Sequence, residues 1–116
     1  MNSEKTRFLS FLGICRKAGK VICGTPLICD QMGKKLKPQL VVIASDASEN
    51  SVKKLTVKSE FYNVQCIICP ATKAELSRAV GKENELAALA ITEKGLAAEL
   101  LKLSGKEGSD ISGSAE

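Results

Sequence analysis

The sequence predicts an α/β protein, a three-layer α/β/α sandwich in which helices cover both faces of a four-stranded mixed sheet. Two observations lead to this prediction. Four short apolar runs alternate with five segments of helical spacing along the chain. One of these runs, residues 40–44, is apolar at every position, which is typical of a strand covered on both faces.

The chain has the length and composition of one such domain. Its 116 residues are 44% hydrophobic and 26% charged, which are ordinary values for a globular protein. We expect the folded domain to span residues 1–103. Residues 104–116 are rich in Gly and Ser and nearly free of apolar side chains, so we expect a disordered tail there.

Apolar spacing and end signals place nine elements. The expected helices cover residues 4–18, 26–36, 49–62, 73–81 and 93–103, and the expected strands cover residues 21–23, 40–44, 64–69 and 86–91. In the first helix, Phe8, Leu12 and Cys15 recur at helical spacing and form one apolar face. Gly19 follows this helix, where a glycine ends helices by adopting the left-handed conformation.

The turn Gly24-Thr25-Pro26 begins the second helix. The Thr25 hydroxyl is expected to cap it, and Pro26 suits the first turn because its missing N–H would be unpaired there. Leu36 falls on the apolar face of this helix, so we expect it to be buried. Pro38 prevents the helix from continuing.

The remaining helices have their own end signals. Ser48 is placed as the N-cap of the third helix, and Asn63 suits the left-handed turn that ends it. Thr72 and Glu75 have the spacing of a capping box at the start of the fourth helix. Thr92 is expected to cap the last helix.

Five cysteines raise the question of a metal or redox site. They are Cys15, Cys23, Cys29, Cys66 and Cys69. Cys66 and Cys69 have C-x-x-C spacing, but they fall in an expected strand, where positions three apart point to opposite faces. Because two thiolates on opposite faces cannot hold one metal ion, we expect five reduced, buried cysteines and neither a metal nor a cofactor.

Composition also excludes several classes of function. The chain has no His, which removes Ser-His-Asp and Cys-His catalysis. It has no Trp, one Tyr and three Phe, too few for a single-strand binder built on a row of stacking rings. Asp46 follows the 40–44 strand, where α/β enzymes often hold a catalytic group, but no second carboxylate stands at motif spacing. We therefore expect Asp46 to stabilise a turn, and an enzyme centred on it is the least supported interpretation.

Positive charge is concentrated in the first half of the chain. Residues 1–60 hold 11 Lys and Arg against 5 Asp and Glu, a net of +6, whereas residues 61–116 hold 6 against 8, a net of −2. This balance favours an anionic partner, nucleic acid first, although solvated surfaces carry similar excesses. No apolar run reaches the ~18 residues of a membrane span and no hydrophobic leader begins the chain, so a cytoplasmic protein is expected.

Four segments, in their order and spacing, resemble a known family. They are residues 12–20 (Leu-Gly-Ile-Cys-Arg-Lys-Ala-Gly-Lys), Gly24-Thr25, residues 44–48 (Ala-Ser-Asp-Ala-Ser) and residues 76–81 (Leu-Ser-Arg-Ala-Val-Gly). The family is the L7Ae/L30e ribosomal protein superfamily, and the match over about residues 5–103 is most similar to its bacterial YlxQ-like branch. The resemblance implies an α/β/α sandwich that binds structured RNA, typically kink-turns, with the start of the second helix beside the loop that follows the fourth.

The resemblance also implies which residues contact the RNA. They are Lys20, Gly24, Thr25, Lys34, Lys82, Glu83 and Asn84. Unpaired N–H groups at the helix start suit a backbone phosphate, the lysines add counter-charge, and the loop of residues 82–84 lies against an extruded nucleotide. The expected partner is structured RNA, with ribosomal RNA among the candidates, and the expected state is a monomer. Neither a membrane nor a small-molecule substrate is expected.

An alternative interpretation keeps the fold and changes the partner. Kink-turn binders of this superfamily usually follow the Gly-Thr with Asn-Glu and, three residues after that Glu, a Lys. Here these positions hold Pro26, Leu27 and Asp30. The first two offer no side-chain hydrogen bond to a base, and the third repels phosphate. The substitutions favour a protein–protein interaction module in which Leu27 contacts the partner protein.

Overall fold

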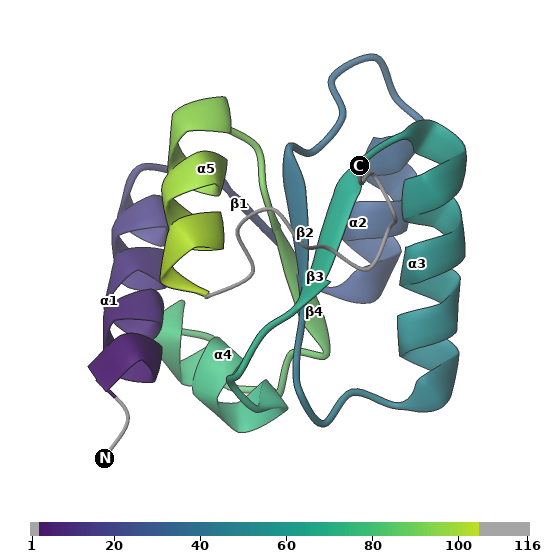
Figure 1. Ribbon diagram of the computed structural model, residues 1–116. Helices are drawn as coiled ribbons and strands as arrows, with labels where there is room; N and C mark the ends of the chain where they lie inside the picture. The colour runs from purple at the N-terminus through teal and green to yellow at the C-terminus, as the bar shows by residue number, and fades with distance from the viewer. Residues whose placement is uncertain (1–2, 105–116) are drawn as a thin grey trace.

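A computed structural model describes residues 3–104, over which five helices and four strands alternate (Figure 1). The helices are α1 (Ser3–Lys17), α2 (Thr25–Met32), α3 (Glu49–Tyr62), α4 (Lys73–Ala79) and α5 (Lys94–Leu103), and the strands are β1 (Val21–Cys23), β2 (Leu40–Ile43), β3 (Gln65–Ile68) and β4 (Ala88–Ile91). The tail expected over residues 104–116 lies outside the described residues, except for its first residue.

The four strands form one mixed sheet in the order β1-β4-β2-β3. β2 and β3 are parallel, whereas β4 runs antiparallel to both β1 and β2. β2 is a central strand, as its unbroken apolar run predicts. Helices α1, α4 and α5 cover one face of the sheet, and α2 and α3 cover the other (Figure 1). The predicted α/β/α sandwich is therefore confirmed.

The core consists of two clusters, because successive side chains of each strand point to opposite faces of the sheet. The larger one, under α1, α4 and α5, is centred on Phe8, Leu12, Cys15, Leu40, Val42, Ile67, Cys69, Leu76, Leu89, Ile91 and Leu100. The smaller one, under α2 and α3, contains Ile28, Met32, Val41, Ile43, Leu55, Val64, Cys66, Ala88 and Ala90. Toward α2, β4 turns only the small side chains of Ala88 and Ala90, which leaves room for α2 to pack on the sheet.

Three of the predicted helix ends are confirmed. The Ser48 hydroxyl accepts a hydrogen bond from the Ser51 N–H at 3.2 Å, and Asn63 ends α3 in the left-handed conformation with a φ of 61°. At α4 the capping box is complete. The Thr72 hydroxyl accepts from the Glu75 N–H at 3.2 Å, and the Glu75 carboxylate accepts from the Thr72 N–H at 2.9 Å.

The prediction that Thr25 caps α2 is wrong. Gly24 occupies the N-cap position with a φ of 98°, a backbone conformation that residues other than glycine rarely adopt. Its N–H donates to the Ala88 carbonyl at 3.1 Å, which extends the pairing of β1 with β4 by one residue. Thr25 is consequently the first residue of the helix.

The second helix also ends earlier than residue 36. It stops at Met32, and Gly33 serves as its C-cap. The Gln31 side-chain amide donates to the Leu36 carbonyl at 2.6 Å and so stabilises a turn after the helix. Leu36 is 80% exposed, so its expected burial is wrong as well.

Thr92 does not cap the last helix, which begins at Lys94. The Thr92 N–H donates to the Lys20 carbonyl at 2.9 Å, in line with the pairing of β1 and β4. The N-cap is Glu93, whose carboxylate accepts from the Leu96 N–H at 2.7 Å. A carboxylate one position later thus replaces the expected hydroxyl.

The two cysteines of the C-x-x-C pattern lie on opposite faces of the sheet, as predicted. Cys66 belongs to the smaller cluster and Cys69 to the larger one. Burial raises the pKa of the Cys69 thiol to about 11, and its Sγ donates to the Ala71 carbonyl at 3.6 Å. The expectation of five buried cysteines is wrong for Cys23, on the edge strand β1, and for Cys29, which are only partly buried.

The capping box makes stability depend on pH through Glu75. The Thr72 N–H, helped by the Lys5 ammonium 3.0 Å away, holds the pKa of this carboxyl below its ordinary value of about 4.3. Because the folded-state pKa is lowered, the stabilisation is complete above the unfolded-state pKa and is lost as the pH falls through the folded-state value. We expect the difference in unfolding free energy between the wild type and Glu75→Gln to shrink from pH 6 to pH 3 in urea titrations.

A matched control separates this effect from the loss of one negative charge. Glu99→Gln removes an exposed carboxylate from α5. Its difference from the wild type is expected to change less between pH 6 and pH 3 than that of Glu75→Gln. Equal changes for both variants would contradict the assignment to the capping box.

Candidate nucleic-acid interface

The sheet brings the start of α2 against the end of the loop between α4 and β4. Cys23 of β1 pairs with Leu89 of β4, and the next hydrogen bond joins Gly24 to Ala88. Residues 80–87 lead into β4 at this point. The juxtaposition implied by the family resemblance, the start of the second helix beside the loop after the fourth, is therefore present in the fold.

The start of α2 presents backbone donors. Gly24 makes no side-chain cap, and its carbonyl accepts from the Ile28 N–H at 3.1 Å as the first helical bond. The N–H groups of Thr25 and Leu27 lie in the first turn, at the positive end of the helix dipole, whereas Pro26 has none. Leu27 is 60% exposed beside them.

The loop after α4 is shaped by one glycine and one backbone bond. Gly81 has a φ of 72°, and the Lys82 N–H donates to the Ser77 carbonyl at 2.8 Å. These features turn the chain away from α4 and leave Lys82, Glu83 and Asn84 exposed. All three expected loop residues are thus accessible to a partner.

A further cation at this surface was missed by the sequence reasoning. The Arg16 guanidinium of α1 donates through Nε to the Val80 carbonyl at 3.2 Å, which places it next to the α4–β4 loop. Burial raises the pKa of the Cys23 thiol, while the positive charges of Lys82 and Arg16 act in the opposite direction. Both cations are therefore close to Cys23, the residue that precedes Gly24. The only signal in the sequence is the position of Arg16 in the residue 12–20 segment.

Lys20 and Lys34 do not join this surface. Lys20 precedes β1 and Gly24 follows it, so the extended chain separates them by roughly 13 Å. Lys34 follows α2, whose eight residues span about 12 Å from the Thr25 end. Its ammonium is also paired with the Asp30 carboxylate at 3.1 Å. Gly24 and Thr25 therefore lie where β1 ends and α2 begins, whereas Lys20 and Lys34 lie at the other ends of these two elements.

Asp46 has a structural role. Its carboxylate accepts a hydrogen bond from the Lys73 N–H at 2.8 Å, which ties the loop after β2 to the start of α4. The carboxylate was expected to stabilise a turn, but its bond spans 27 residues of chain and joins two separate segments.

Two other kinds of site are absent from residues 3–104. No helix there is both long enough and apolar enough to cross a membrane. The same residues contain no group of three or more His, Cys, Asp or Glu arranged to hold a metal ion.

Comparison with known proteins identifies the family. The profile of the ribosomal protein L7Ae/L30e/S12e/Gadd45 family matches residues 7–101. The chain belongs to this family. Two L7Ae-family relatives are both named RNA-binding protein YlxQ. The one from Bacillus subtilis is 34% identical over 96 residues, covering 79% of this chain and 89% of the relative, and the one from Enterococcus faecium is 33% identical over 101 residues, covering 86% and 93%.

Two solved structures share the fold of this chain. A Bacillus halodurans protein of unknown function has a TM-score of 0.77 at 26% identity, with 84% of this chain and 96% of that chain covered. The Giardia lamblia 15.5kD RNA binding protein has a TM-score of 0.72 at 20% identity, with 91% and 88% covered. The second likeness concerns the fold alone. The resemblance to the bacterial YlxQ-like branch is confirmed by the two relatives of that name.

Proposed function

We propose that this protein is a non-enzymatic RNA-binding protein of the L7Ae type that acts as a monomer on structured RNA. The observation that carries the proposal is the hydrogen bond of Gly24, at the α2 start, to Ala88, where the α4–β4 loop ends, with Arg16 and Lys82 close by. We name this area the Gly24–Lys82 surface and define it by Arg16, Gly24, Thr25, Lys82, Glu83 and Asn84. The two YlxQ relatives, named as RNA-binding proteins, support the same conclusion.

The chemistry of the Gly24–Lys82 surface suits a sharply bent phosphate backbone. The first-turn N–H groups of α2 and the helix dipole favour a phosphate at Thr25. Arg16 and Lys82 add positive charge on the same side, so binding is expected to weaken with salt as counterions are released. The Asn84 amide both donates and accepts hydrogen bonds, which suits the edge of an unstacked base.

Kink-turn recognition by this chain differs from the usual pattern of the family. In kink-turn binders of this superfamily, polar side chains at two positions of the second helix read sheared G·A pairs. Here these positions hold Pro26 and Leu27, and neither offers a side-chain hydrogen bond. We propose that the kinked backbone is recognised mainly through phosphates and shape, with Leu27 packing against the RNA surface. Ribosomal RNA, which contains such folded elements, is the proposed class of partner.

Binding to a kink-turn RNA, and to the same RNA with its G·A pairs replaced, tests this proposal. Replacement of the G·A pairs removes the kink, so we expect tighter binding to the kink-turn RNA and a loss of affinity for both RNAs at higher salt. Calorimetry or gel shift at two salt concentrations measures both effects. Equal, salt-sensitive binding to the two RNAs would retain the RNA partner and exclude kink-turn recognition.

One observation favours a protein partner as the second candidate function. Leu27 is 60% exposed at the start of α2, and Asp30 follows on the same helix. A protein-interaction module would use this apolar side chain as its contact. This alternative would be favoured if the chain bound neither RNA and captured a protein after nuclease treatment, and if that capture depended on Leu27.

A further inference from the structure

A basic hollow lies at the ends of β1 and α2 that are remote from the Gly24–Lys82 surface. It has a volume of about 660 Å³, and its polar lining is formed by Lys20, Gln31, Lys35, Lys37, Gln39 and Thr92. None of the residues that line it is acidic. Three ammonium groups and two amides around one open hollow form a surface of positive potential that attracts anions.

Backbone hydrogen bonds hold the segments that form this hollow. The Thr92 N–H bonds the Lys20 carbonyl at 2.9 Å, and the Gln39 N–H bonds the Ile91 carbonyl at 2.7 Å. The Gln31 amide stabilises the turn that carries Lys35. The lysines therefore extend from a framework fixed by the sheet and by α2.

An aromatic pair continues the hollow onto α3. The Lys37 ammonium donates to the Tyr62 carbonyl at 3.4 Å and lies 5.7 Å from the centre of the Tyr62 ring. The Lys58 ammonium lies 6.0 Å from the same centre. Phe61 packs edge to face against Tyr62, with 4.8 Å between ring centres, yet remains 78% exposed. The exposed Phe61 ring thus packs on the Tyr62 ring, which two ammonium groups approach.

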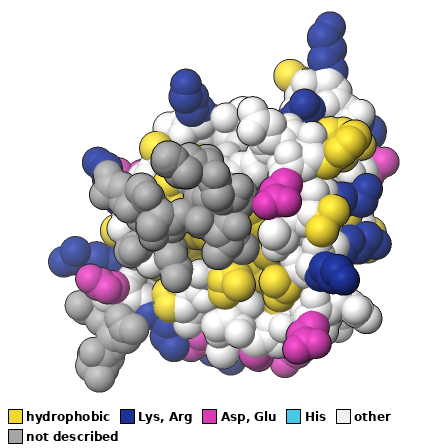
Figure 2. Space-filling model, turned by 45° about the vertical axis from the view of Figure 1, so that its right-hand side comes forward, with side chains coloured by type: hydrophobic (Ala, Val, Ile, Leu, Met, Phe, Trp, Pro, Cys, Tyr) yellow, Lys and Arg dark blue, Asp and Glu magenta, His cyan; other side chains and the backbone are white. Residues whose placement is uncertain are grey.

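The space-filling view shows how charged and hydrophobic side chains are distributed over one face of the molecule (Figure 2). On the right of this view, Lys and Arg side chains lie among hydrophobic ones, with a few Asp and Glu side chains on the same face (Figure 2). We name the area of Lys20, Lys35, Lys37, Lys58, Phe61 and Tyr62 the lysine–aromatic end. Its hollow lies at the end of α2 that is remote from Gly24, and α2 spans about 12 Å.

We propose that the lysine–aromatic end binds a single-stranded RNA segment, with phosphates in the lysine-lined hollow and one base stacked on Phe61. Lysines that follow a backbone and an exposed ring for a base are the combination by which proteins hold single strands. The inference rests on the proposed function, since the segment is a single-stranded extension of the RNA held at the Gly24–Lys82 surface. One ring and one hollow accommodate a short segment, which agrees with the scarcity of aromatic residues in the chain.

The test compares a structured RNA with and without a ten-nucleotide uridine extension, and includes the labelled decauridine alone. We expect the extension to tighten wild-type binding by about tenfold, and Lys35→Glu/Lys37→Glu to abolish that gain. Phe61→Leu is expected to reduce the gain by about fivefold through loss of stacking. Binding of the RNA without the extension should change less than about twofold in either variant, because both variants leave the Gly24–Lys82 surface intact.

The lysine–aromatic end and the Gly24–Lys82 surface can be tested independently of each other. Arg7→Glu/Lys102→Glu reverses two exposed charges on α1 and α5 that are remote from the hollow, and it is expected to retain the gain from the extension. Phe61→Leu serves as an independent variant if the loss of the Lys37 contact disturbs the end of α3. The inference is wrong if the extension adds no affinity, or if Arg7→Glu/Lys102→Glu loses as much of the gain as Lys35→Glu/Lys37→Glu. Binding of decauridine without binding of the structured RNA would support this surface and exclude the other.

Discussion

Reversal of the two cations beside Gly24, in the double variant Arg16→Glu/Lys82→Glu, lowers the affinity for structured RNA by about one hundredfold at 50 mM salt. Each reversal removes a positive charge and introduces a negative one next to the phosphates at the start of α2. The loss should shrink at 200 mM salt, because fewer counterions are released when the contacts are absent. Fluorescence anisotropy with one labelled RNA at both salt concentrations measures the effect.

Folding must be verified for this variant because Arg16 also bonds the Val80 carbonyl. Lys82→Glu alone keeps that bond and should still lose about tenfold in affinity. The matched control, Lys94→Glu/Lys102→Glu, changes the net charge equally on α5. If this control weakens binding as much as the Arg16 and Lys82 changes, the attraction is a property of overall charge and the Gly24–Lys82 surface is not the contact.

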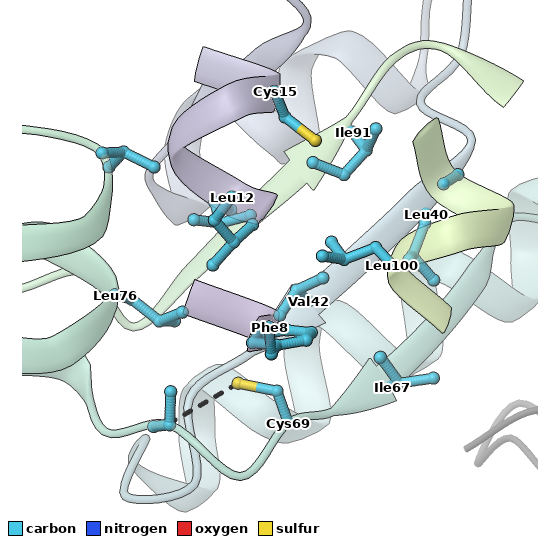
Figure 3. Close-up of a cluster of buried hydrophobic side chains, with 14 of the residues drawn as sticks. Phe8, Leu12, Cys15, Leu40, Val42, Ile67, Cys69, Leu76, Ile91 and Leu100 are labelled. Carbon is cyan, nitrogen blue, oxygen red and sulfur yellow. Dashed lines mark hydrogen bonds between the residues drawn. The ribbon is translucent and has the colours of Figure 1, made fainter. Parts of the chain in front are cut away.

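Phe8→Ala is expected to lower the unfolding free energy by about 3–5 kcal/mol. Phe8 is fully buried in the larger cluster, where its ring lies among Val42, Cys69 and Leu100 (Figure 3). Truncation removes the ring from the contact of α1 with the sheet and leaves a cavity that a packed core fills only in part. Urea denaturation followed by circular dichroism measures the change.

Phe61→Ala is the matched control for this truncation. It removes the same ring from a position that is 78% exposed, so the expected loss is below about 1 kcal/mol. Similar losses for the two variants would show that α1 does not pack on the sheet through Phe8. An unfolded Phe8→Ala protein would agree with the prediction, since a loss of this size is comparable to the whole stability of a small domain.

Elements whose signals are local could be predicted from the sequence. The Ser48 cap, the left-handed Asn63 and the capping box of Thr72 and Glu75 are all confirmed. Each depends on groups within about four residues of one another, so the chain specifies it before any long-range contact forms. The central strand was equally predictable, because a run buried on both faces needs apolar residues at every position.

Cap signals at the ends of the paired strands β1 and β4 were misleading. Thr25 and Thr92 both have the residue type of an N-cap, yet neither serves as one. The N–H of Gly24 bonds Ala88, and the N–H of Thr92 bonds Lys20, since β1 and β4 pair across the sheet. Residue type alone does not reveal which partner strand will claim a backbone group.

The sequence by itself determined the fold class, the family and the excess of positive charge in the first half of the chain. Only the tertiary structure decided which charges act together. Because β1 is three residues long, Lys20 and Gly24 lie at its opposite ends, although they are close in sequence. Because α1 packs beside the loop after α4, Arg16 lies near Lys82, although 66 positions separate them. Cooperation between charges depends on distance in space, and distance in space is set by the pairing of strands and the packing of helices.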